Sequence, residues 1–194
     1  GVKRLQKTYM KAEDISPYDI CWSASVPPEF TQAIHHWVGA RGYWEGAPDA
    51  LMACMHFESG GTFDPSIQNL GGSKYFGLIQ FGEMAAKDLG VSLEVLRSMT
   101  QLEQLEYVFR YFEMWEKRGK KYTRLEDFYL TILYPKAVGM KPDEILWEEG
   151  TKVYTQNRGL DLNKDGQITI GEISERLYQS YYTGMLPANR VQFD

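Results

Sequence analysis

The chain has 194 residues, 43% of them hydrophobic, which is enough for one compact domain with a sizeable core. Its formal net charge of −5 makes nucleic acid an unfavourable partner, because nucleic acid is itself polyanionic. No signal peptide and no apolar run long enough to cross a membrane is visible, so we expect no membrane insertion. The chain opens on glycine, and we interpret it as a monomeric part of a longer polypeptide.

The first helix is predicted well inside the chain. Residues 1–26 begin with basic side chains and lack sustained periodicity, which indicates an inter-domain connection or an arm on the surface. Pro27, Pro28 and Glu29 are typical of a helix start. Apolar residues at helical spacing then predict a helix to about Ala40.

A second helix, predicted over residues 49–58, ends in an acid. Its apolar residues Leu51, Cys54 and Met55 lie at offsets of three and four. Glu58 is the next position on this stripe, so its carboxylate is expected to face the core. Burial and the negative end of the helix dipole both raise the pKa of such a carboxyl, and a protonated carboxyl can act as a general acid. The alternative is a glutamate that reaches solvent or pairs with an arginine.

Two short sequence blocks begin at Glu58 and at Gly77. Residues 58–66 read Glu-Ser-Gly-Gly-Thr-Phe-Asp-Pro-Ser, and residues 77–81 read Gly-Leu-Ile-Gln-Phe. Together they resemble the lysozyme-like superfamily, most closely goose-type lysozymes and family 1 lytic transglycosylases. The resemblance gives Glu58 the position of the catalytic acid. It makes Ser59, beside the acid, and Gln80, at the substrate-amide position, the substrate-binding residues.

Two further helices are predicted, each begun by a Thr-x-x-Glu capping box, at Thr100 and at Thr123. The second ends at Tyr134, because the next residue is a proline. Tyr134 falls where lytic transglycosylases have a tyrosine, and the resemblance makes it a hydrogen-bonding neighbour of Glu58. Residues 125–139 are similar to lysozyme-like modules of phage tail proteins and of type VI secretion effectors that attack peptidoglycan.

The segment 161–172 matches the EF-hand calcium loop. The predicted metal ligands are Asp161, Asn163, Asp165, the backbone carbonyl of Gln167, and Glu172 with both oxygens, while Thr169 takes the position that often reaches the ion through water. Ca²⁺ is favoured over Mg²⁺, because a flexible loop with a bidentate glutamate supplies more ligands than an octahedral ion accepts. Only one such loop is visible, so we interpret the ion as structural.

These elements predict a mostly α-helical fold in three parts. Residues 1–26 form the N-terminal arm or linker, and residues 27–140 form a lysozyme-like core with a small β or loop element at its cleft. Residues 141–194 form a C-terminal segment that carries the calcium loop and packs on the core. Cys21 and Cys54 either form one disulfide or remain free, and we favour free thiols.

The resemblance implies an enzyme that cleaves the β-1,4 bond between N-acetylmuramic acid and N-acetylglucosamine in peptidoglycan glycan strands. A hydrolase needs a second carboxylate, for which Glu83 is preferred over Asp64 and Asp88. A lytic transglycosylase needs none, because the muramic acid 6-hydroxyl attacks and leaves 1,6-anhydro ends. We favour a muramidase that is secreted or delivered to the bacterial periplasm. A non-catalytic, calcium-stabilised wall-binding module is the third alternative.

Overall fold

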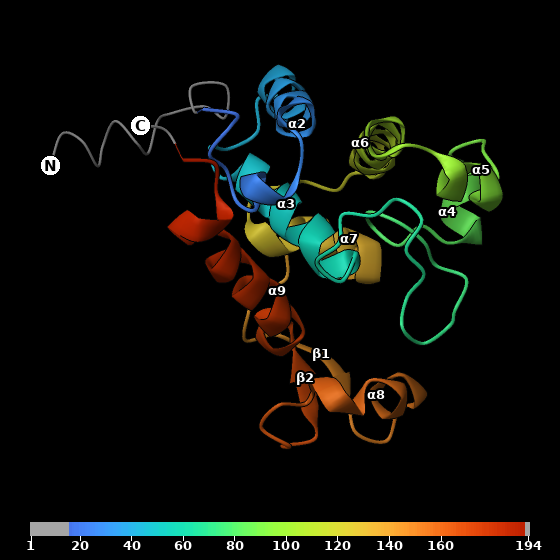
Figure 1. The fold of residues 1–194 in the computed structure, drawn as a ribbon. Coiled ribbons are helices and arrows are strands. Elements are labelled where there is room, and N and C mark those ends of the chain that lie inside the picture. Colours follow the sequence, from blue (N-terminus) through green and yellow to red (C-terminus); the bar gives the residue numbers. More distant parts are fainter. Residues whose placement is uncertain (1–15, 193–194) are drawn as a thin grey trace, which may run out of the picture.

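The computed structural model describes residues 16–192, and these are mostly α-helical (Figure 1). The helices are α2 (Pro28–Ala40), α3 (Ala47–Glu58), α4 (Glu83–Asp88), α5 (Leu93–Ser98), α6 (Gln101–Lys117), α7 (Leu125–Leu133), α8 (Lys152–Gln156) and α9 (Ile170–Gly184). Single 3-10 turns are η2 (Ser23–Ser25), η3 (Pro135–Ala137), η4 (Arg158–Leu160) and η5 (Pro187–Asn189). Two short strands, β1 (Ile145–Glu148) and β2 (Gln167–Thr169), pair antiparallel.

Helix α6 begins with the capping box that the sequence predicts at Thr100. Thr100 accepts a hydrogen bond from the Glu103 N–H at 3.2 Å, and the Glu103 carboxylate accepts one from the Thr100 N–H at 3.1 Å. At the start of α7 the hydrogen-bond partner predicted for Thr123 is wrong. Asp127, not Glu126, accepts the hydrogen bond from the Thr123 N–H, at 2.9 Å, because the helix begins one residue later than expected.

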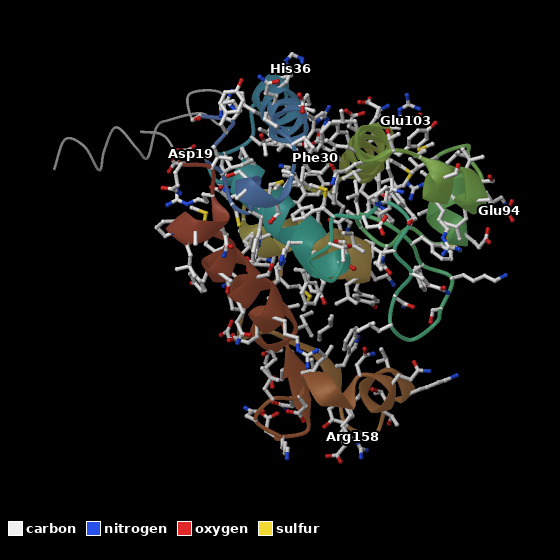
Figure 2. All side chains as sticks on the ribbon, viewed as in Figure 1. Asp19, Phe30, His36, Glu94, Glu103 and Arg158 are labelled. Atoms are coloured by element: carbon white, nitrogen blue, oxygen red, sulfur yellow. The ribbon has the colours of Figure 1, made fainter. Side chains whose placement is uncertain are left out.

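Helix α3 lies at the centre of the main body, packed against α2, α7 and α9 (Figure 1). Its buried residues are Ala47, Pro48, Ala50, Leu51, Met52, Ala53, Cys54 and Met55, so it has apolar neighbours on every side. Figure 2 shows Phe30 of α2 inside this body, whereas His36, Glu94 and Arg158 lie on the outside. The C-terminal end of α3 therefore lies in apolar surroundings.

A second, smaller cluster forms a C-terminal lobe at the lower end of α9 in Figure 1. Its buried residues are Leu130, Ala137, Trp147, Tyr154, Ile168, Ile170 and Ile173. Helix α9 joins this lobe to the main body, since Ile173 belongs to the small cluster and Leu177, one turn later, belongs to the large one. The segment 141–192 therefore packs on the rest of the chain through α9.

The described part of the predicted N-terminal arm belongs to the main body. Residues 1–15 lie outside the described residues, but Ile20, Cys21 and Trp22 are buried in the large cluster. The Trp22 N–H donates to the Gly184 carbonyl at 3.1 Å, so this segment is held against the end of α9. Linker or surface arm is thus the wrong description for residues 16–26.

Two further expectations concern covalent links and membranes. Cys21 and Cys54 are both buried and free, as the sequence analysis favours. Within residues 16–192, no helix has the length and apolar character needed to span a bilayer.

We predict that Leu177→Ala lowers the free energy of unfolding by about 3 kcal/mol, because it leaves a cavity where α9 packs on the main body. Urea denaturation measures the change. The control Leu186→Ala, at a side chain that is 53% exposed, should cost less than about 0.5 kcal/mol. Equal, small effects in both variants would contradict the role given to α9.

Candidate functional site

A groove of about 730 Å³ runs across the main body beside the end of α3. Its walls come from α3, the loop between α3 and α4, the first residues of α4, α6 and α7. The loop that forms one wall, residues 59–82, stands out from the helices in Figure 1. Phe57, Tyr75, Tyr111, Trp115 and Tyr129 give the groove an aromatic lining. Such a mixture of apolar rings and few polar groups is typical of a ligand site.

Glu58 is the last residue of α3 and lines this groove. Burial raises the pKa of its carboxyl from 4.5 to about 8. Among residues 16–192, no hydrogen bond or ion pair reaches this carboxyl. The expectation of a partly buried acid on the core side of the helix is therefore met, and the arginine-paired alternative is not. A carboxyl in this state keeps its proton at neutral pH.

Tyr129, on α7, lines the groove together with Glu58. Its ring meets Phe57 edge to face with centroids 5.4 Å apart. Burial raises the pKa of the Tyr129 hydroxyl, and the charge of Glu58 raises it further. The hydroxyl of Tyr111 is already used, because it donates to the Thr131 carbonyl at 3.3 Å. No hydrogen bond within the described residues uses the Tyr129 hydroxyl, which leaves it available to a ligand.

Tyr134 does not take the predicted place beside Glu58. Helix α7 ends at Leu133, and the backbone of Tyr134 leaves it with φ −160° and ψ 89°. Its ring packs against Trp147 of the C-terminal lobe, with centroids 6.0 Å apart, and Tyr134 is not part of the groove wall. Tyr129, Ile132 and Leu133 lie at helical spacing, and this spacing is the sequence signal that places Tyr129 on the groove with the other two.

Ser59 and Gln80 both shape the loop that forms the groove wall. Ser59 is only 1% exposed, and its Oγ accepts the Phe63 N–H at 2.9 Å, so the structure places it behind the groove instead of in it. Gln80 does line the groove, but its Nε2 donates to the carbonyls of Ile67 and Gly77, each at 3.1 Å. The Gln80 amide therefore braces the wall, and its contact with a substrate amide stays a prediction.

The three candidates for a second acid lie in different settings. Glu83 is exposed at the first residue of α4, on the groove wall. Asp88 also lines the groove, but it pairs with Arg118 at 3.4 Å. Asp64 accepts hydrogen bonds from the Ser66 N–H at 2.8 Å and from the Ser66 hydroxyl at 2.9 Å, so its carboxylate caps the local backbone turn. Glu83 is thus the best placed of the three.

The groove wall also includes an exposed aromatic ring, that of Tyr75. Tyr75 is 49% exposed and lines the groove, whereas its neighbour Phe76 is buried and only packs. The Tyr75 ring lies against Gly82, where a Cβ atom would come within 2.6 Å of the ring. Glycine at position 82 therefore lets the ring rest on the backbone.

The second candidate site is the loop 161–172 in the C-terminal lobe. Asp161, Asp165 and Glu172 each offer a carboxylate oxygen, and these oxygens lie within 4.8 Å of one another. The turn at Gly166 has φ +84°, a conformation that favours glycine. The chain thus brings together three of the predicted ligands in a donor set made only of oxygen atoms. Such a set suits a hard divalent cation.

Hydrogen bonds hold these carboxylates in place. Glu172 accepts the Leu162 N–H at 2.7 Å and the Thr169 N–H at 3.1 Å. Asn163 donates its side-chain amide to Asp165 at 3.3 Å. A hydrogen bond from Tyr154 is the main cause that holds the pKa of Asp161 below its usual value. Gln167 lies in β2, where its backbone pairs with Glu148.

No protein-family model matches this chain. Neither a curated protein nor a solved structure matches it. Function is therefore inferred from the groove and the loop themselves.

The raised pKa of Glu58 predicts how stability depends on pH. Between its ordinary value of 4.5 and about 8, the unfolded chain has lost the proton that the native state keeps. The stabilising contribution is full below the lower value and is lost as pH rises to the upper one, at about 1 kcal/mol per pH unit. Urea denaturation of the wild type and Glu58→Gln across this window should show the wild type falling relative to the variant. Parallel curves would contradict the assignment.

Proposed function

We propose that the protein is a glycosidase of the muramidase type, with a lysozyme-like core over residues 27–140. It would cut the β-1,4 bond between N-acetylmuramic acid and N-acetylglucosamine in peptidoglycan, which implies action in the bacterial periplasm. One observation carries the proposal: Glu58, with a pKa raised to about 8 and no partner among residues 16–192, presents its carboxyl to a groove of about 730 Å³ lined by aromatic rings. Glu58 of the first sequence block that resembles the superfamily and Ile79, Gln80 and Phe81 of the second line this same groove.

The chemistry follows from the placement of the acid. Glu58 donates its proton to the glycosidic oxygen while the sugar develops oxocarbenium character. The exposed face of Tyr75 offers a platform for a pyranose ring, and the Tyr129 hydroxyl offers a hydrogen bond near the acid. Gln80 keeps the wall that faces the sugar in shape.

Two endings of the reaction are available to this groove. In hydrolysis, Glu83 would act as the second carboxylate. Besides Glu58, it is the acid on the groove wall that forms no ion pair among the described residues. In a lytic transglycosylase, Glu58 would take the proton from the substrate hydroxyl itself. The second ending needs no acid besides Glu58, which is half-buried, whereas Asp88 and Glu83 on the same wall are both exposed.

We predict that Glu58→Gln lowers the rate of turbidity loss of purified peptidoglycan by about 100-fold or more, because the amide cannot donate the proton. Circular dichroism checks that the variant is folded. Equal, negligible activity in both proteins would favour a non-catalytic wall-binding module. Mass spectrometry of the released fragments separates the endings: reducing ends with Glu83→Gln inactive indicate hydrolysis, and 1,6-anhydro ends with Glu83→Gln active indicate transglycosylation.

We also propose that residues 161–172 bind one structural Ca²⁺. Asp161, Asp165 and Glu172 already lie close enough to share an ion, and Asn163 and the Gln167 carbonyl would complete the set. Helix α9 begins at Ile170, inside this loop, so an ion held here would fix the start of the helix that joins the lobe to the main body. In the proposed function the ion stabilises the fold and takes no part in cleavage.

We predict that Ca²⁺ at 100 times its dissociation constant adds about 2.7 kcal/mol to stability, because only the native loop binds it. Thermal unfolding with Ca²⁺ and with EDTA measures the gain. Glu172→Gln should abolish the response, whereas Glu175→Gln, the same change three residues along α9 at an exposed side chain, should keep it. A melting temperature that EDTA does not change in the wild type would show that the loop binds no stabilising ion.

A further inference from the structure

The first ligand of the proposed calcium loop is held from outside the loop. Tyr154, on α8, donates its hydroxyl to Oδ2 of Asp161 at 2.6 Å. Both side chains are buried, at 4% and 5% exposure, so solvent does not compete for this bond. The rule that describes EF-hand ligands covers only the twelve loop residues, and Tyr154 precedes them by seven.

The two oxygens of Asp161 are used unequally. Oδ2 accepts from Tyr154 and also from the Gly166 N–H at 2.9 Å. Oδ1 receives the longer bond from the Asp165 N–H, at 3.2 Å. A carboxylate with two good donors on one oxygen cannot rotate without breaking both of them. Oδ1 is then the oxygen that has lone pairs to spare for a cation.

The fold brings Tyr154 to this place through β1. Trp147 of β1 pairs with Ile168 of β2 in the middle of the loop, and the Glu149 N–H donates to the Gly166 carbonyl at 2.7 Å. Helix α8 starts three residues later, with Thr151 as its N-cap, and carries Tyr154 back to the first ligand. The segment 145–156 therefore touches the loop at its strand, at its turn and at Asp161.

We propose that Tyr154 is a positioning residue for Ca²⁺, which fixes the Asp161 carboxylate before the ion arrives and so raises the affinity of the loop. This inference rests on the calcium site proposed above. Groups that hydrogen-bond to metal ligands from outside the coordination sphere set the orientation of those ligands, and removing one typically weakens metal binding by about 10-fold to 100-fold. The ring of Tyr154 packs in the small cluster, so its hydroxyl can be removed while the packing stays.

Calorimetric titration of the metal-free protein with Ca²⁺ tests the proposal. Tyr154→Phe should raise the dissociation constant about 10-fold. The matched control is Tyr122→Phe, because Tyr122 is equally buried and its hydroxyl also donates at 2.6 Å, but to the Phe112 carbonyl in the main body. The control should lose thermal stability without Ca²⁺ and keep the wild-type dissociation constant.

The other outcomes each overturn the inference in a different way. If Tyr154→Phe lowers the melting temperature without Ca²⁺ but binds Ca²⁺ as the wild type does, Tyr154 has only a structural role. If the variant binds more tightly, the hydroxyl competes with the ion instead of preparing its ligand. If the wild type takes up no Ca²⁺ in the titration, the calcium site itself is wrong and the role of Tyr154 is lost with it.

Discussion

The burial of α3 is the constraint on which the main body depends. This helix has apolar neighbours along most of its length, so its last residue lies in a poorly solvated environment. The helix ends with Glu58, and residues 16–192 supply no cation to meet its charge. A carboxyl without a partner in such a setting lowers its free energy by holding a proton. The candidate acid is thus a product of the packing around it.

Helix α9 connects the C-terminal lobe to the main body. Its first turns lie in the small cluster and its later turns in the large one, so the two clusters share a single rigid element. Ser180, near its end, accepts the Trp22 indole N–H at 2.9 Å through its carbonyl and contacts His56 Nδ1 at 2.7 Å through its hydroxyl. The N-terminal segment, α3 and α9 therefore form one connected unit.

The sequence predicted α2, α3, α6 and α7, because their apolar spacing and caps are local signals, but it did not predict the short helices α4, α5 and α8. Glu58 on the core side of its helix and the three clustered carboxylates of the calcium loop also follow from spacing alone. The roles of Ser59 and Tyr134 could not be predicted this way. Each lies just past the end of a helix, where a single backbone turn decides which way the side chain points. Tyr154 could not be found from the loop motif, because it lies in α8, outside the loop residues.

The two cysteines illustrate a last property of this packing. Burial raises the pKa of both thiols, and the charge of Glu58 adds to the effect at Cys54. Disulfide exchange and oxidation proceed through the thiolate, which these surroundings disfavour. Neither sulfur is exposed to an oxidant or to a second thiol. The folded chain can therefore pass between reducing and oxidising surroundings without a change at its two cysteines.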